Sequence, residues 1–294
     1  MISVVIVNFN RKELLCECLD SVKRQDVRDL EVIVIDNGSS DGSAELVAAY
    51  PEVRLIQNPE NVLFCKAYNQ GIDASRGDFI LCLNNDVCLE KNYLSEALFA
   101  IGLDERIGMV SGKILRPDKK TIDSTGLFLG RNRKAVERGY NKKDRGQYDD
   151  PGYVFGVSGA CVFFRRAFLA DVKDQYGYFD ERFGAYYEDL DICWRGQRQG
   201  WKAYYEPKAV ACHTRAATAI GDKKGRRGPN IFYLSDGLRK RYVRNRYLCM
   251  KKNDSLQGIL VNLPFVLFYE IQQWCYVFFV KYLCRGRLYA CPKM

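Results

Sequence analysis

The sequence predicts an α/β fold with a mostly parallel sheet, and three observations support this. Continuous β-branched runs at residues 2–7 and 31–35 are typical of strands buried on both faces. Stretches with apolar residues at helical spacing alternate with such runs through the first third of the chain, as right-handed βαβ units require. The chain of 294 residues is 47% apolar and 28% charged, which excludes a disordered or fibrous protein.

The first third of the chain supplies the parallel part of this sheet. In order, we expect a strand at 2–7, a helix at 11–24, a strand at 31–35, a helix at 43–50, a strand at 53–56, a helix at 61–74 and a strand at 79–83. Polar turns at 8–10, 36–41 and 84–86 follow three of these strands. Because parallel sheets bind ligands at the carboxyl ends of their strands, these turns predict acid and amide side chains along one rim.

The regular alternation is lost after Gly108, where the sequence predicts a mixed sheet. We expect strands at 122–129 and 154–164, a polar loop at 131–150 between them, a helix at 188–198, short strands at 202–205 and 209–212, and helices from 231 onward. These elements predict a globular domain over residues 1–228, with halves of about 1–110 and 111–228, and a helical extension over 229–294.

Two of the polar turns carry candidate ligand-binding residues. Asp36 follows a buried strand, where its carboxylate either accepts hydrogen bonds from a nucleobase or ribose or only caps its own turn. Asn84, Asn85 and Asp86 follow another strand, and their oxygens suit a Mg²⁺ or Mn²⁺ ion that neutralises a bound diphosphate. The same three residues also form a good turn, so this pattern alone leaves both interpretations open.

A second group of candidates opens a later helix. Glu188, Asp189 and Asp191 repel one another, and the positive helix N-terminus favours their ionised, base-competent forms. Asp191 lies four residues before Arg195 and is expected to form an ion pair, which leaves Glu188 and Asp189 for chemistry unless the group is a plain acidic helix start. His213, the one histidine of the chain, ends a predicted strand beside the acidic rim, so a metal there needs carboxylate and phosphate oxygens.

The net charge of +9 is concentrated in one block. Residues 213–252 contain twelve Lys or Arg against two acids, whereas the rest of the chain is nearly neutral. Such a block suits anionic lipid or a phosphorylated partner, and a solvated surface is the alternative. Residues 259–280 are apolar, but Asn262, Pro264 and Glu270 interrupt them, so we expect helices that lie on the inner face of the membrane. Packing on the domain, or on a second copy in a homodimer, is the alternative.

Cysteine usage and the absence of other motifs further narrow the class of protein to which this chain can belong. The twelve cysteines include no C-x-x-C pair, which together with a single histidine excludes a zinc finger. The chain begins as a strand, without the basic region of an export signal, so unpatterned thiols predict a reducing cytoplasm. No aromatic-rich basic sheet motif is present, and we expect no nucleic-acid partner.

Several stretches together resemble family 2 of the nucleotide-sugar glycosyltransferases, whose members have the A-type fold. The matching stretches are 4–10, 34–42, 83–87, 156–160, 177–183, 187–195 and 244–248. Their order and spacing are most similar to the rhamnosyltransferase-like branch, enzymes of bacterial surface polysaccharide assembly. The resemblance covers roughly residues 2–252 and implies a Rossmann-like, mostly parallel central sheet flanked by helices, with residues 1–228 as the catalytic domain.

The resemblance implies a role for each matching residue. Substrate binding is implied for Asn8, Asn10 and Asp36 at the nucleoside, for Asn84, Asn85 and Asn69 near the donor, and for Ser158, Gly159 and Ala160 on the donor-sugar and acceptor side. Chemistry is implied for Asp189 as the base with Glu188 beside it, for Asp86 as the ligand of Mg²⁺ or Mn²⁺, and for His213 as a further metal or diphosphate contact.

Two positions depart from the pattern of the family. Asn84 occupies the first acidic position of the D-x-D motif, which leaves Asp86 as its only carboxylate. Leu63 stands where the family usually has glycine, which bears on how closely the backbone approaches a phosphate.

The activity that the resemblance implies is an inverting sugar transfer by single displacement. The donor would be a dTDP- or UDP-linked sugar, with rhamnose as one candidate, and the acceptor a saccharide, expected to be lipid-linked. Two other classes stay open. One is a nucleotidyltransferase, which would release pyrophosphate, and the other is a non-catalytic membrane-binding protein with a degenerate transferase domain.

Overall fold

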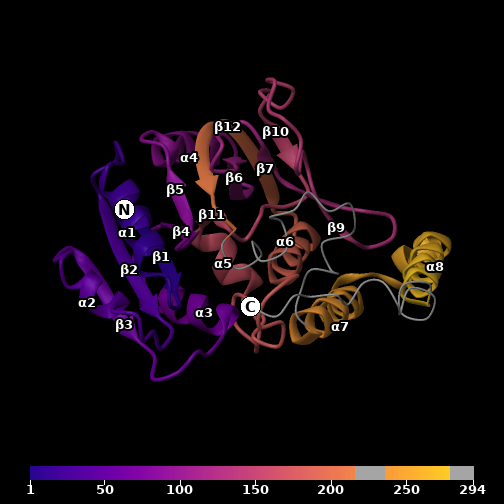
Figure 1. The fold of residues 1–294 in the computed structure, drawn as a ribbon. Coiled ribbons are helices and arrows are strands. Elements are labelled where there is room, and N and C mark those ends of the chain that lie inside the picture. Colours follow the sequence, from indigo (N-terminus) through magenta and orange to yellow (C-terminus); the bar gives the residue numbers. More distant parts are fainter. Residues whose placement is uncertain (216–235, 279–294) are drawn as a thin grey trace.

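A central sheet organises the chain, whose computed structural model describes residues 1–215 and 236–278 (Figure 1). The described strands are β1 (Ile2–Asn8), β2 (Leu30–Asp36), β3 (Val53–Gln57), β4 (Phe79–Asn84), β5 (Val87–Leu89), β6 (Ile107–Leu115), β7 (Ile122–Ser124), β8 (Leu127–Leu129), β9 (Ala135–Glu137), β10 (Gly152–Val154), β11 (Cys161–Arg165) and β12 (Lys202–His213). The described helices are α1 (Lys12–Lys23), α2 (Ser43–Val47), α3 (Phe64–Ala74), α4 (Tyr93–Gly102), α5 (Arg166–Val172), α6 (Glu188–Arg198), α7 (Asp236–Asn253) and α8 (Leu256–Phe278).

The strand directions confirm the predicted α/β class with a mostly parallel sheet. In the described residues the main path of the sheet is β10-β12-β6-β11-β4-β1-β2-β3, and β5 and β7 pair with β12 and β6. Strand β1 is parallel to β2 and β4, β2 to β3, and β6 to β12. Strand β11 runs antiparallel to β4 and β6, so the residues just before β11 lie at the carboxyl end of β4.

Both faces of the sheet are buried, which explains the continuous apolar runs. Val4 and Ile6 of β1 pack into one hydrophobic core with α1 and α4, whereas Val5 packs into the other with α3, α5 and α6. Helix α3 lies so close to β1 that a Cβ at Gly71 would stand 2.2 Å from Val5 Cγ1. Alternate residues of one strand thus serve opposite cores, and each core holds one layer of helices.

Several elements differ from those predicted. The strand predicted at 122–129 is two strands, because Gly126 turns the chain with φ of +115°. The strand predicted at 154–164 is interrupted between β10 and β11, and the polar loop at 131–150 contains β9. The two short strands predicted at 202–212 form the single strand β12, with a register shift between Glu206 and Val210. Helices α4 and α5 and strand β6 were not predicted.

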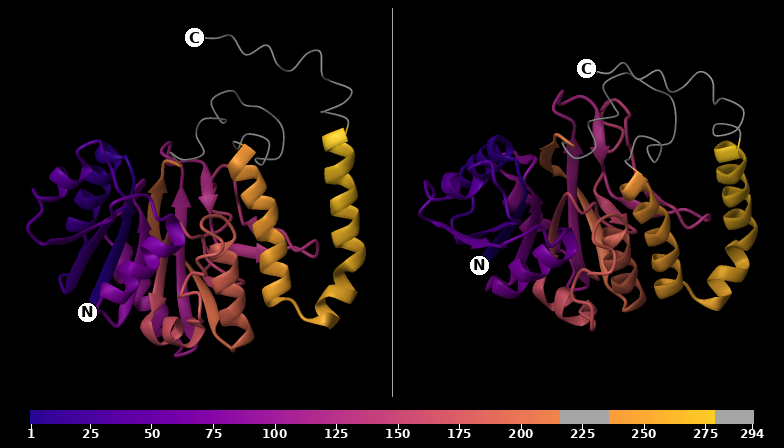
Figure 2. Two further views of the ribbon diagram at one scale, coloured as in Figure 1. Left: turned by 90° about the horizontal axis from the view of Figure 1, so that it is seen from below. Right: turned by 60° about the horizontal axis from the view of Figure 1, so that its bottom comes forward.

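Helices α7 and α8 form a hairpin at the opposite end of the molecule from β1–β3 (Figures 1 and 2). The sequence assigned α7 to the extension, and in the structure α7 packs against the preceding part of the chain. Lys252 Nζ lies 2.7 Å from Asp180 and 3.1 Å from Asp191, and Asn253 donates a 2.7 Å hydrogen bond to Asp191. The boundary predicted at residue 228 lies outside the described residues.

Helix α8 presents its apolar side chains to the outside. The large exposed side chains along it are Leu256, Leu260, Val261, Leu263, Phe265, Leu267, Phe268, Ile271 and Trp274. Glu270 points the other way and pairs with Arg246 of α7, and the ring of Phe265 contacts Arg131 from the domain at 3.8 Å. Within residues 1–215 and 236–278, no helix combines the length and apolar character needed to cross a bilayer.

Candidate active site

The predicted rim forms where β1, β2 and β4 end. Asn8 is the register partner of Asp36, and Val7 is the partner of Asn84, so the turns after these strands lie side by side. The amide of Asn8 joins two of them: its Nδ2 donates to Asp36 Oδ1 at 3.0 Å, and its Oδ1 accepts from Asn85 Nδ2 at 2.6 Å. The structure therefore brings Asn8, Asp36 and Asn85 together.

The buried carboxylate of Asp36 caps its own turn. Ser39 donates its main-chain N–H to Asp36 Oδ2 at 3.0 Å and its hydroxyl to Oδ1 at 2.6 Å. Asn10 ties the neighbouring turn to the same segment, because its Oδ1 accepts the N–H of Ser40 at 2.8 Å. Capping was one of the two interpretations for Asp36, and nucleoside contacts by Asp36 and Asn10 stay predictions.

Asn84 and Ala160 join the rim to the segment before β11. The N–H of Asn84 donates to the carbonyl of Ala160 at 2.9 Å, and Tyr68 donates its hydroxyl to Asn84 Oδ1 at 3.1 Å. The side chain at the first position of the D-x-D motif is thus engaged by a core tyrosine. Asp86, two residues later, supplies the carboxylate of this motif and lies against strand β12.

Asp86 and His213 meet at the carboxyl end of β12. His213 Nε2 lies 3.3 Å from Asp86 Oδ1, and both side chains are buried. Two ligands of one octahedral Mg²⁺ or Mn²⁺ ion, each about 2.1 Å from it, stand roughly 3 Å apart, so this pair fits such an ion. Within the described ranges no group of three or more His, Cys, Asp or Glu is placed to hold a metal, so further ligands would come from substrate and water.

Asp123 orients His213, and the sequence analysis missed it. Its Oδ2 lies 2.8 Å from His213 Nδ1, while Arg215 and Arg116 lie 2.6 Å and 2.7 Å from its other oxygen. Burial acts to raise the pKa of Asp123, but His213 and Arg215 outweigh burial and hold that pKa below its ordinary value. A carboxylate on the second ring nitrogen directs the first one toward a ligand, as in many metal sites.

Asp189 and Glu188 begin α6 at the same edge of the sheet. Asp189 Oδ2 accepts the N–H of Gly159 at 3.3 Å, and its Oδ1 accepts the N–H of Leu190 at 2.8 Å. A Cβ on Gly159 would lie 3.2 Å from Asp189 Cβ, so only glycine allows this close approach without displacement. The structure therefore places Asp189 directly against the 158–160 segment.

Burial, and not the helix N-terminus, dominates the ionisation of these two carboxyls. Burial raises the pKa of Glu188 to about 8, and the nearby charge of Asp189 adds to this. Burial also raises the pKa of Asp189, although the N–H groups of Gly159 and Leu190 favour its charged form. Among the described residues, Glu188 Oε2 has no hydrogen-bond partner. Two adjacent carboxyls with raised pKa values are suited to holding and accepting protons.

Glu137, on the hairpin strand β9, lies between the group around His213 and the group around Asp189. Ser158 donates its hydroxyl to Glu137 at 3.1 Å, and Arg215 lies 3.9 Å from the same carboxylate oxygen. Burial raises the pKa of Glu137 to about 7. This residue lies within the polar loop predicted at 131–150, and no pattern in the sequence distinguishes it. A continuous series of side-chain contacts therefore connects His213, through Asp123 and Arg215, to Ser158.

Asn69 lies outside this group. Its Nδ2 donates to the carbonyl of Phe179 at 2.9 Å, and its Oδ1 accepts the N–H of Phe179 at 3.0 Å. The buried amide thus holds the backbone of a loop. Its predicted contact with substrate stays a prediction, and these hydrogen bonds give it a structural role.

Leu63 has a backbone conformation that is nearly restricted to glycine. Its φ of +70° and ψ of 170° lie at the start of α3. We expect Leu63→Gly to raise the free energy of unfolding by about 1 kcal/mol, because relief of strain exceeds the entropy that glycine adds to the unfolded chain. Urea unfolding measures this. Leu103, also an exposed leucine but with φ of −66°, is the control, and equal losses in both glycine variants would contradict the prediction.

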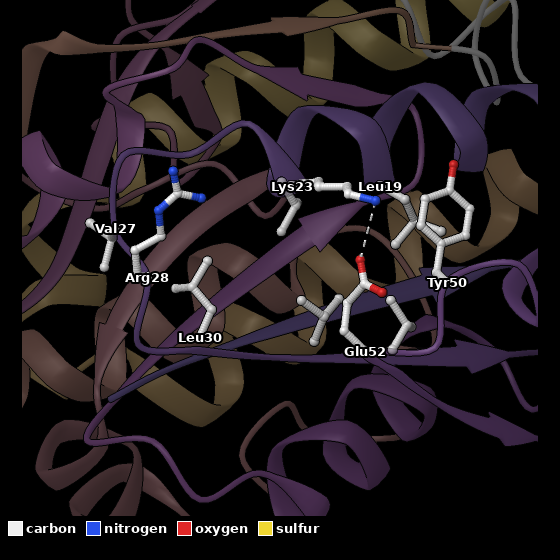
Figure 3. Close-up of a pocket in the computed structure, with 10 residues that line it drawn as sticks. Leu19, Lys23, Val27, Arg28, Leu30, Tyr50 and Glu52 are labelled. Carbon is white, nitrogen blue, oxygen red and sulfur yellow. Dashed lines mark ion pairs between the residues drawn. The ribbon is translucent and has the colours of Figure 1, made fainter.

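A surface hollow of about 210 Å³ lies at another edge of the sheet (Figure 3). It is lined by Leu30 and Val53, at the starts of β2 and β3, and is bordered by the Lys23–Glu52 ion pair of 3.8 Å. Asn8, Asp36 and Asn84 lie at the opposite, carboxyl ends of β1, β2 and β4. The hollow therefore does not belong to the active site.

Comparisons with solved structures agree with the fold. GalNAc-T7, solved with UDP, GalNAc and Mn²⁺, superposes with a TM-score of 0.62 over 83% of this chain and 48% of its own, at 17% identity. The mannosyltransferase PcManGT from Pyrobaculum calidifontis, solved with GDP-Man and Mn²⁺, gives 0.54 over 93% and 82%, at 18% identity. These likenesses show the A-type glycosyltransferase fold.

Sequence comparisons identify the family. The N-acetylglucosaminyl-diphospho-decaprenol L-rhamnosyltransferase of Mycobacterium tuberculosis is 28% identical over 243 residues, which cover 74% of this chain and 76% of that protein. The poly-beta-1,6-N-acetyl-D-glucosamine synthase of Staphylococcus aureus is 25% identical over 212 residues, or 71% of this chain and 48% of the synthase. The profile of glycosyl transferase family 2 matches residues 3–172. The chain therefore belongs to glycosyl transferase family 2.

Proposed function

We propose that this glycosyltransferase inverts the anomeric carbon of a sugar that it moves from a nucleoside diphosphate to a saccharide. One observation carries the proposal: Asp189, with its raised pKa, and the Asp86–His213 pair lie at the same edge of the sheet, joined by the Asp123–Arg215–Glu137–Ser158 contacts. A base and a diphosphate site on one rim are the requirements for single displacement.

In the proposed reaction Asp189 accepts the proton of an acceptor hydroxyl. The hydroxyl oxygen bonds to the anomeric carbon as the bond from that carbon to the diphosphate oxygen breaks, and the nucleoside diphosphate leaves. A divalent ion held by Asp86 and His213 would stabilise the negative charge on the leaving diphosphate. Asn8, Asn10, Asp36, Asn84 and Asn85 would hold the donor, and the segment Ser158, Gly159 and Ala160 would face the sugar and acceptor.

The similarity to one relative supports a proposal for the donor and the acceptor. The mycobacterial relative is named as a rhamnosyltransferase with a lipid-diphosphate acceptor, and it is matched over three-quarters of its length. We therefore propose a dTDP- or UDP-linked donor, with L-rhamnose as the first sugar to try, and a lipid-linked saccharide acceptor of surface polysaccharide assembly.

Product analysis tests the reaction class. Incubation with dTDP-L-rhamnose or a UDP-sugar, Mn²⁺ and a lipid-diphosphate saccharide should release the nucleoside diphosphate. Release of pyrophosphate would instead indicate nucleotidyl transfer. A thermal-shift screen of dTDP, UDP and GDP with and without Mn²⁺ would identify the base, because a bound ligand raises the melting temperature.

We also propose that α8 attaches the enzyme to the inner face of the membrane. Glu270 faces the protein and pairs with Arg246, which leaves the apolar side chains of α8 outside. A helix with this orientation is suited to an apolar environment. Part of the basic block is internal, because Arg215 and Lys252 also form ion pairs within the domain. The apolar face therefore carries more of this proposal than the charge does.

Vesicle sedimentation tests the attachment. Replacing Leu260, Leu267, Phe268 and Trp274 by serine should lower binding to vesicles of equal parts phosphatidylglycerol and phosphatidylcholine at least about 10²-fold, since each large apolar side chain contributes about 1.5–3 kcal/mol when buried. Serine at the exposed Phe99 and Leu103 is the control and should change nothing. If the wild-type chain does not bind the vesicles at low salt, the attachment is refuted. A concentration-dependent dimer would then explain the exposed apolar face of α8.

A further inference from the structure

The loop that leads into the catalytic helix has an unfavourable backbone. Gly184, Tyr186 and Tyr187 have φ values of +69°, +71° and +71°. Two consecutive tyrosines in the left-handed region are not stable on their own, so their surroundings must hold them. Tyr187 is also the N-cap of α6 and makes no side-chain capping hydrogen bond. The direction in which α6 begins therefore depends on what holds this loop.

Asn245 of α7 holds the loop. The two N–H groups of its Nδ2 are shared among the carbonyl oxygens of Phe183 at 2.8 Å, Ala185 at 2.9 Å and Tyr186 at 2.8 Å. The residue is fully buried, so water does not compete for this amide. Its Oδ1 accepts two hydrogen bonds from Arg244, of 3.1 Å and 2.8 Å, which fixes the orientation of the amide.

Other contacts of α7 hold the same loop. Arg244 Nη2 also donates to the carbonyl of Arg182 at 2.6 Å, and the ring of Tyr242 packs edge-on against Tyr186 at 5.9 Å and Tyr187 at 5.0 Å. The loop is thus fixed from one side by one helix. Immediately after it stand Glu188 and Asp189, and the hydrogen bond from Gly159 fixes Asp189 from the opposite side.

We propose that Asn245 is a positioning residue, which sets the place of the base Asp189 by holding the carbonyls of the loop before α6. The inference rests on the proposed function, since it takes Asp189 as the base. Without the amide, the carbonyls of Ala185 and Tyr186 lose this donor and that of Phe183 keeps only a longer contact with Arg244, so the loop relaxes toward ordinary φ values. The start of α6 then moves relative to Gly159, and a displacement of about 1 Å at a reacting group is enough to lower a rate about 10²-fold.

The chain offers a matched control at the other end of α7. Asn253 is also buried and donates to Asp191, which lies within α6 and not in the loop. Asn245→Ala should lower kcat about 10²-fold, with the affinity for dTDP or UDP in the presence of Mn²⁺ unchanged. Asn253→Ala should lower the melting temperature but preserve kcat. Arg244→Ala, at an exposed site, supplies a variant that folds should Asn245→Ala unfold, and it should lower kcat several-fold.

A double-mutant cycle separates positioning from a general loss of structure. In the Asp189→Asn background, Asn245→Ala should cause no further loss of kcat, because both changes remove the same action. An additive loss, or wild-type kcat in both Asn245→Ala and Arg244→Ala, would overturn the inference alone. A wild-type enzyme that releases no nucleoside diphosphate would overturn the proposed function and this inference with it.

Discussion

Replacing Asp189 by asparagine is expected to lower kcat at least about 10²-fold, the scale of a lost general base, while nucleotide affinity stays unchanged. Asparagine keeps the shape of the side chain but accepts no proton, and its single oxygen can accept only one of the N–H groups of Gly159 and Leu190. Steady-state release of nucleoside diphosphate gives kcat, and calorimetric titration with dTDP or UDP gives the affinity. In the wild type, kcat should rise with pH as Asp189 loses its proton, at a pH above the ordinary range of an aspartate.

Glu188→Gln is the matched control for this prediction. Burial and the charge of Asp189 raise the pKa of Glu188 to about 8, so Glu188 is mostly protonated at pH 7 and glutamine imitates that form. We expect Glu188→Gln to keep most of its activity at pH 7. An inactive Glu188→Gln beside an active Asp189→Asn would assign the base to Glu188 instead.

Removing the divalent metal is expected to weaken nucleotide binding. Chelation, or Asp86→Ala, should each weaken the affinity for the nucleoside diphosphate at least about tenfold, or ~1.4 kcal/mol, because the diphosphate charge then lacks its counter-ion. Added Mn²⁺ should restore affinity in the chelated wild type and not in Asp86→Ala. Calorimetric titration with and without Mn²⁺ makes the measurement.

Two further variants sharpen this test. Asp123→Asn should weaken the affinity for Mn²⁺ about 10- to 100-fold, because His213 loses the carboxylate that orients its ring. Asp104→Ala removes a surface carboxylate paired with Lys202 and should leave nucleotide affinity unchanged. If wild-type affinity is equal with and without chelator, the metal site is refuted and His213 is a structural residue.

The sequence predicted the fold where the local pattern and the buried position agree. Strands β1, β2 and β4 are continuous apolar runs because both of their faces are buried, so the local sequence alone predicts these strands. Helix α4 was missed because its sequence, YLSEALFAIG, is apolar on most faces and gives little periodic signal. Strand β6 was missed because it contains two glycines and Lys113, whose charge is paired with Asp144 at 3.1 Å.

The residues of the site likewise divide into those that the local sequence predicts and those that it does not. Turn residues such as Asn8 and Asp36 could be placed together because strand pairing brings the ends of parallel strands to one edge. Asp123, Glu137 and Asn245 could not be placed, because each becomes a neighbour of the site only through tertiary packing. Asp123 meets His213 across 90 residues of sequence, and no local pattern encodes a contact of that kind. Asn245 lay within a stretch that resembled the family, but its partners were not deducible.

The hairpin of α7 and α8 has a consequence for how the enzyme meets its acceptor. One helix holds the loop before Asp189, and the other directs Phe268 and Trp274 outward. Attachment through α8 would keep the base at a constant height above the lipid and confine the search for a lipid-linked acceptor to two dimensions. The effective concentration of the acceptor at the membrane, and not its bulk concentration, then determines how often the enzyme meets it. A water-soluble acceptor without its lipid would lose this advantage and show a high KM even though its reacting sugar fits.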